Sequence, residues 1–275
     1  MKIGIVDYYL SEWHANNYPA WLIKASAAIG IEATVTMAWA EQEISPVDSV
    51  STDEWCKKQG VARAESLAEL CKNCDAVMIL APSDPEKHLE YARIVLPYGK
   101  PTFIDKTFAP NLCEAEEIIS LAEQFGTPVF SSSALRFSEE LDSLTGSKNL
   151  IFTAGGSNLE EYLVHPLEMA VKLLDEPIDR VWVKKQGAQY LLGGETANGA
   201  RMTVVFAQKM PYTIAAHDGQ EAQSYAAIRS DFFGGLMRAI LRFFDSGIPP
   251  VKATQTLEIM RLRDALLAEG ARSDI

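Results

Sequence analysis

The chain has 275 residues, of which 48% are hydrophobic, and this composition can fill the core of one large domain or two modest ones. A formal net charge of −12 argues against nucleic acid or an anionic membrane as the main partner, because like charges repel. No apolar run approaches the roughly 20 residues of a membrane span. The four cysteines are too few for a disulfide scaffold, and residues 1–6 predict a strand rather than a signal peptide, so a cytoplasmic location is expected.

Strand and helix patterns alternate along the first half of the chain. Short apolar runs predict buried strands at residues 3–6, 32–38, 76–81, 102–104 and 128–130. Helical spacing of apolar residues predicts helices at residues 18–29, 64–71, 89–96 and 115–124. Such alternation is typical of a doubly wound parallel sheet with helices on both faces. We therefore predict an α/β domain of this kind over residues 1–133.

The second half changes to alternating apolar and polar residues. A strand is expected at residues 149–153 and a helix at 166–174, followed by period-two runs at 180–184, 188–192, 202–206 and 212–216. Gly, Asn and Pro separate these runs, as in an antiparallel sheet. Helices are expected at residues 232–244 and 253–267. Residues 134–275 are therefore predicted to form an α+β domain with an open, mainly antiparallel sheet.

The apolar run at residues 102–104 ends in Asp105 and Lys106. Ligands of open parallel sheets bind at the carboxyl ends of the strands, so Lys106 is a candidate to contact a substrate. Its ammonium can donate a hydrogen bond to a hydroxyl or carbonyl oxygen, or move a proton if burial lowers its pKa. The alternative is a lysine that faces solvent at the end of a strand.

Several short segments occur in an order that resembles the Gfo/Idh/MocA-type dehydrogenases. They are residues 66–70 (SLAEL), 75–82 (DAVMILAP), 88 (H), 99–101 (GKP), 105–107 (DKT), 135–137 (LRF) and 247–250 (GIPP). The resemblance implies a Rossmann-like first domain and oxidation or reduction of a small sugar- or polyol-like substrate with NAD or NADP. It also implies a homodimer or homotetramer that forms through the sheet of the second domain.

The resemblance implies roles for single residues as well. Lys106 would polarise an oxygen of the substrate, and His165 would exchange its proton. The residues expected to border the cofactor are Asp7, Ser11, Ala81, Ser83, His88 and Asp105. Pro166 suits a first helical position, which would place His165 beside the helix N-terminus and favour a neutral ring that can accept a proton. The alternative is that His165 is a plain cap or packs at the domain interface.

A dinucleotide-binding fold needs glycines after its first strand, because they let the backbone approach the diphosphate. Here Asp7, Tyr9 and Glu12 stand at those positions, two acids and one bulky side chain. The acid expected at the end of the second strand, which would bind the ribose, is missing from residues 36–40. The cofactor therefore binds in an altered way or has been lost. In the second case, the chain is a cofactor-free small-molecule binding or partner protein.

The segment at residues 7–17 is rich in polar and aromatic side chains, which could line a site for a sugar or another small polar ligand. Asp7, Glu12 and His14 could hold a divalent metal, but their spacing matches no known ligand pattern, so no metal is predicted. The alternative is a rigid aromatic plug that closes an unused cleft. Residues 131–133 (SSS) lack the context of a serine nucleophile.

Overall fold

The computed structural model describes residues 1–144, 147–217 and 222–272. The chain divides into two compact units, one formed by residues 1–132 and 233–256 and the other by residues 133–232 and 257–275. The predicted boundary after residue 133 lies within one residue of the first division. Residues 233–256 differ from the expectation, because they pack with the first unit rather than with the second.

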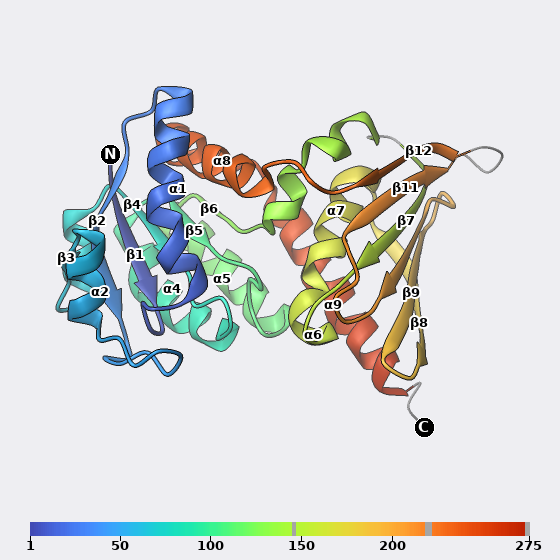
Figure 1. Ribbon diagram of the computed structural model, residues 1–275, viewed down its shortest axis with the longest axis horizontal. Coiled ribbons are helices and arrows are strands. Elements are labelled where there is room, and N and C mark those ends of the chain that lie inside the picture. Colours follow the sequence, from blue (N-terminus) through green and yellow to red (C-terminus); the bar gives the residue numbers. More distant parts are fainter. Residues whose placement is uncertain (145–146, 218–221, 273–275) are drawn as a thin grey trace. The chain divides into compact units, whose positions relative to one another are not determined.

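The first unit contains a six-stranded parallel sheet in the order β3-β2-β1-β4-β5-β6 (Figure 1). Its strands are β1 (Lys2–Asp7), β2 (Thr34–Ala40), β3 (Ala62–Arg63), β4 (Ala76–Ile79), β5 (Thr102–Ile104) and β6 (Val129–Phe130). This order confirms the predicted Rossmann-like sheet. The direction of winding reverses between β1 and β4, and ligands of such sheets bind outside the carboxyl ends of the strands at that point.

Helices and short 3-10 turns connect these strands. They are α1 (Trp13–Ile29), α2 (Thr52–Gln59), α3 (Leu67–Asn73), η1 (Pro85–Lys87), α4 (His88–Val95), η2 (Leu96–Tyr98) and α5 (Leu112–Phe125). Helix α8 (Phe232–Ser246) follows the strands of the second unit in the chain, and from residue 233 on it belongs to the first unit. Helix α1 begins five residues earlier than predicted, because Glu12 caps it and the buried Pro19 is accommodated inside it. Helix α2 was not predicted. It is short and mostly polar, and a capping box formed by Ser51 and Glu54 marks its start.

The second unit contains a six-stranded sheet in the order β12-β11-β7-β10-β9-β8. Its strands are β7 (Asn149–Ala154), β8 (Ile178–Gln186), β9 (Gln189–Thr196), β10 (Arg201–Phe206), β11 (Thr213–His217) and β12 (Ala222–Ala227). The pair β7 and β10 is parallel and the other pairs are antiparallel, which confirms the predicted mainly antiparallel sheet. Strand β12 was not predicted.

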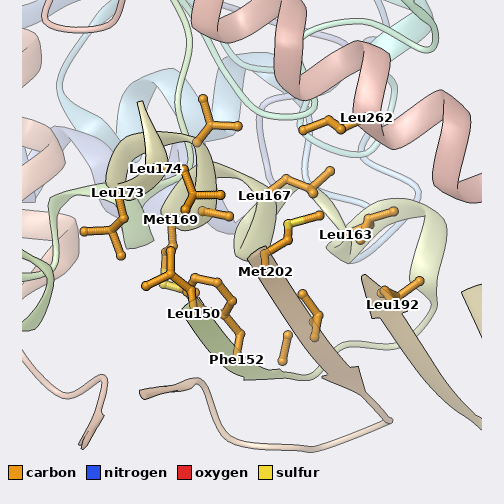
Figure 2. Close-up of a cluster of buried hydrophobic side chains, with 14 of the residues drawn as sticks. Leu150, Phe152, Leu163, Leu167, Met169, Leu173, Leu174, Leu192, Met202 and Leu262 are labelled. Atoms are coloured by element: carbon orange, nitrogen blue, oxygen red, sulfur yellow. The ribbon is translucent and has the colours of Figure 1, made fainter. Parts of the chain in front are cut away.

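Helices cover one face of this second sheet. They are α6 (Leu159–Tyr162), α7 (Val164–Leu174) and most of α9 (Ala253–Arg272), with the 3-10 turns η3 (Ala134–Phe137) and η4 (Glu139–Leu144). Figure 2 shows the core between them, where Leu150, Phe152 and Met202 from the sheet lie near Leu167 of α7. All of these side chains are at least 98% buried, so apolar burial holds this unit together. Among the described residues, no helix is long and apolar enough to cross a membrane.

Candidate functional site

Asp7 is the last residue of β1 and is only 1% exposed. Its Oδ1 accepts hydrogen bonds from the main-chain nitrogens of Tyr8 (2.7 Å) and Ala81 (3.1 Å). Its Oδ2 is buried and has no hydrogen-bond partner among the described residues. Burial first, and then the negative charges of Glu12 and Asp105, raise the pKa of Asp7 well above its usual value. The carboxyl group therefore retains a proton to higher pH than an ordinary aspartate.

This raised pKa makes stability depend on pH. A group that binds its proton more tightly in the folded state loses stability as the pH rises from its unfolded pKa, about 4 for Asp, through its folded pKa. Asp7→Asn removes this loss, so its melting temperature at pH 7 should exceed that of the wild type by about 2 °C or more. The gain should shrink toward pH 4. Thermal scans between pH 4 and pH 7 check this prediction, with a substitution at the exposed Asp53, Asp53→Asn, as the control. A gain in melting temperature that does not vary with pH would contradict the prediction.

Glu12 occupies the N-terminus of α1. Its carboxylate accepts hydrogen bonds from the main-chain nitrogens of His14 (2.7 Å) and Ala15. These are the first-turn N–H groups that bind the diphosphate in a dinucleotide fold. A carboxylate of this chain thus occupies the place of the ligand anion and adds negative charge there. The residues at the β1–α1 turn do not fit a dinucleotide that is seated in the usual way on this helix.

The end of β2 corrects one sequence interpretation. Strand β2 runs to Ala40, two residues beyond the predicted end, so the acid that follows it is Glu41. Its carboxylate accepts hydrogen bonds from Lys87 Nζ (2.7 Å) and Tyr91 Oη (2.8 Å). Although partial burial opposes the effect, these two donors lower the pKa of Glu41. An acid therefore does stand where a ribose would be bound, but it already has two protein partners.

Asp105 follows β5 and is 1% exposed. Its Oδ1 accepts a hydrogen bond from Tyr18 Oη (3.4 Å), and its Oδ2 lies 3.7 Å from His14 Nε2 and 4.0 Å from Lys106 Nζ. His14 Nδ1 lies 3.3 Å from the carboxylate of Glu12. The imidazole thus lies between two carboxylates. Through these contacts, the polar segment at residues 7–17 and the end of β5 form one buried network.

Lys106 does not face solvent, because its side chain is only 12% exposed. Its Nζ donates a hydrogen bond of 3.5 Å to the carbonyl oxygen of Pro82 and lies at ion-pair distance from Asp105. The solvent-facing alternative is therefore wrong. An ammonium held by one carbonyl and one carboxylate at the carboxyl edge of the sheet can still donate to a ligand oxygen, because it carries three N–H groups.

His88 is wholly buried, and its expected position beside a cofactor stays a prediction. Its Nδ1 lies 3.0 Å from the carbonyl oxygen of Phe108, and its Nε2 lies 2.7 Å from that of Leu80. Burial lowers the pKa of His88 despite these two carbonyls. Both ring nitrogens face main-chain oxygens, so the ring links the segments after β4 and β5 rather than presenting a nitrogen to a ligand.

The other residues expected to contact the cofactor differ in their burial and in their hydrogen bonds. The hydroxyl of Ser11 is buried and donates a hydrogen bond to Asp48 (2.7 Å). Ala81 is buried, has a positive φ of 38° and offers its N–H to Asp7. Ser83 is exposed. A cofactor contact by any of these residues stays a prediction. Among the described residues, no group of three His, Cys, Asp or Glu side chains is placed to hold a metal.

His165 is the second residue of α7 in the second unit. The helix begins at Val164, two residues before the predicted start, and the preceding α6 ends at Tyr162, so His165 is not an N-cap. Its Nδ1 lies 2.7 Å from Ser133 Oγ, and the rings of Tyr162 and Tyr212 lie edge-on to it at 5.6 and 5.8 Å between centroids. The imidazole is therefore held from several sides.

The contact of His165 with Ser133 was not predicted. Ser133 caps the turn η3, and it belongs to a run of three serines that carries no signal for a distant partner. His14 and Tyr18 were likewise not expected to meet Asp105, because 87 or more residues separate them along the chain. Lys106 belongs to the first unit and His165 to the second, so their predicted cooperation stays a prediction.

Comparison with known proteins agrees with this fold. Residues 33–133 match the model of the oxidoreductase family with an NAD-binding Rossmann fold. YceM of Salmonella typhimurium, which is named as an oxidoreductase, is 28% identical over 153 residues, covering 54% of this chain and 47% of that protein. The matched segment thus spans about half the length of this relative.

Solved structures resemble almost the whole chain. A probable dehydrogenase from Thermotoga maritima superimposes with a TM-score of 0.80 at 15% identity, over 98% of this chain and 96% of that one. For scyllo-inositol dehydrogenase of Lactobacillus casei, solved with NAD(H) and scyllo-inositol, the TM-score is 0.77 at 13% identity, over 98% and 96%. Over residues 33–133 the chain is thus similar in sequence to this oxidoreductase family. It lacks the glycine-rich turn after β1.

Proposed function

We propose that this protein is an oxidoreductase that acts on a hydroxyl or carbonyl carbon of a small sugar- or polyol-like substrate. The observation that carries the proposal is the position of Lys106, which is mostly buried beside Asp105 at the carboxyl end of β5. Ligands of this kind of sheet bind at that edge. The dehydrogenase neighbours support the reaction class, and the scyllo-inositol in one of them supports the substrate class.

In this proposal Lys106 and His165 have different roles toward the reacting hydroxyl or carbonyl group. Lys106 donates a hydrogen bond to the reacting oxygen and stabilises the negative charge that develops on it. His165 accepts the proton of the hydroxyl group in oxidation and returns it in reduction. Asp105 directs the ammonium, because its carboxylate lies at ion-pair distance from Lys106 Nζ.

NAD or NADP is the redox partner that the family implies, and it would supply the acceptor or donor of hydride when bound. Glu41 has the chemistry to bind a ribose hydroxyl, if it exchanges the hydrogen bond from Tyr91. The N-terminus of α1, where the diphosphate would bind, is however already capped by the carboxylate of Glu12. A dinucleotide would therefore place its diphosphate away from α1 and bind more weakly than is usual for this fold.

The second candidate function is a cofactor-free small-molecule binding or partner protein. The capping of α1 by Glu12 favours it, because the helix N-terminus no longer offers its N–H groups to an anion. A site for a polar ligand would then include Asp7 and the network around Asp105. Either function is compatible with the proposed cytoplasmic location.

Calorimetric titration with NAD, NADH, NADP and NADPH separates the two candidates. The wild type should bind one of these nucleotides weakly, and the triple variant Asp7→Gly, Tyr9→Gly, Glu12→Gly should bind it at least tenfold more tightly, because two acidic side chains and one bulky side chain are removed. Glu12→Ser, which keeps a neutral cap, should give part of the gain. No binding by any of these proteins would favour the cofactor-free candidate. Tight binding by the wild type would contradict the proposed displacement of the diphosphate.

We also propose that the protein forms a homodimer or homotetramer through the uncovered face of the second sheet. A row of facing residues crosses that face, and its exposed members include Tyr225 (70%), Ile151 (47%) and Trp182 (40%). Exposed apolar side chains that line up on one face in this way are unusual on a monomer. Ile151→Glu should therefore reduce the mass measured by light scattering, whereas Gln186→Glu at the edge of the sheet should not. A wild-type protein that is monomeric at all concentrations would contradict this proposal.

A further inference from the structure

The hydroxyl of Ser133 contacts the Nδ1 side of the His165 ring. The two atoms are 2.7 Å apart, and Ser133 is fully buried. The same oxygen accepts a hydrogen bond of 3.2 Å from the main-chain nitrogen of Leu135, which fixes its position at the start of η3. A ring nitrogen that faces a fixed hydroxyl cannot rotate away without losing this hydrogen bond.

Ser133 is itself fixed by a buried ion pair. Its main-chain nitrogen donates a hydrogen bond to Glu168 Oε1 (3.0 Å), and Arg136 Nη1 donates to Glu168 Oε2 (3.1 Å) and to the carbonyl oxygen of Glu168 (3.3 Å). Glu168 and Arg136 are 3% and 6% exposed. A buried ion pair contributes little net stability on average, because desolvation offsets attraction, but it restricts geometry. Glu168 lies one turn after His165 on α7, so the pair ties the ring and the serine to one rigid helix.

We propose that Ser133 is a positioning residue for His165, held in place by Glu168 and Arg136. In this role its hydroxyl oxygen accepts a hydrogen bond from Nδ1–H, so the neutral ring carries its lone pair on Nε2. When Nε2 takes a proton from the substrate hydroxyl, the bond from Nδ1 to Ser133 becomes charge-assisted and strengthens. The proton is thus bound and released at one defined atom. This inference rests on the proposed role of His165, whereas its structural part can be tested without turnover.

Histidine ¹⁵N NMR tests that structural part. The chain has only four histidines, and His165→Asn assigns the relevant signals by their loss. The wild type should show His165 with its proton on Nδ1. Ser133→Ala should shift the ring toward the Nε2-protonated form and change its titration midpoint, and Ser133→Thr should restore both. Ser138→Ala is the matched control, because Ser138 is also buried but donates to the carbonyl oxygen of Leu135 (2.8 Å).

The outcomes separate this inference from the proposed function. Wild-type His165 with its proton on Nε2, or a signal that Ser133→Ala leaves unchanged, would overturn the positioning role. If Ser133→Ala loses the native spectrum, the test uses Glu168→Gln instead. This variant keeps an acceptor for the main-chain nitrogen of Ser133 and should weaken the preference of His165 for a proton on Nδ1. Where turnover is measurable, Ser133→Ala should lower kcat about tenfold, shift the pH profile and leave KM nearly unchanged. An altered tautomer with unaltered kcat would sustain the positioning but refute the role of His165 in proton transfer.

Discussion

Lys106→Met is expected to abolish turnover while the protein remains folded. Methionine keeps the length and the packing of the buried stem but removes the ammonium, which is the group proposed to polarise the reacting oxygen. Preorganised donors of this kind are worth about 10²–10³ in kcat when they are neutral N–H groups, and a charged donor contributes more. The measurement is kcat with any accepted polyol or sugar, together with a thermal scan of both proteins.

The matched control is Lys100→Met. Lys100 precedes β5, whereas Lys106 follows it, so the two lysines lie at opposite ends of the same strand. The control should keep nearly full activity. An unchanged kcat for Lys106→Met would refute the polarising role. A melting temperature that falls by many degrees would mean that Lys106 compensates the buried charge of Asp105, in which case Lys106→Arg, which keeps the charge, separates folding from chemistry.

His165→Asn is expected to lower kcat by roughly two to four orders of magnitude, the usual contribution of a general base. Asparagine can still form a hydrogen bond with Ser133, but it cannot accept a proton at neutral pH. Because His165 lies inside the first turn of α7 and is not an N-cap, the substitution removes no helix cap. The pH profile of kcat should lose the limb that reports the imidazole.

His217→Asn, at the end of β11, is the control for loss of a histidine elsewhere in the same unit. It should leave both kcat and its pH profile unchanged. If His165→Asn keeps near-wild-type activity, then His165 is a packing residue between the rings of Tyr162 and Tyr212. The wild-type enzyme would then need another proton acceptor.

Local sequence patterns predicted most of the fold, because the apolar runs of the buried strands can be recognised in the sequence. Parallel strands that are buried on both faces read as unbroken apolar runs, and β1, β4 and β5 were placed within two residues. The missed elements are α2, β3, α6 and β12. Helix α2 is mostly polar, β3 and α6 have only two and four residues, and β12 lies at the edge of its sheet. The ends of strands were predicted less accurately than their positions. Because β2 extends two residues beyond its predicted end, the sequence analysis did not recognise Glu41 as the acid that follows it.

The sequence by itself determined the two-part architecture, the loss of the glycine turn and the candidates Lys106 and His165, because each depends on residue type and short-range spacing. Only the tertiary structure decided what these residues contact. Glu12 binds the N-terminus of α1, Asp105 meets His14 and Tyr18, and His165 meets Ser133. The physical reason is that most of these contacts join segments far apart along the chain, where position is set by the packing of strands and helices rather than by local preference.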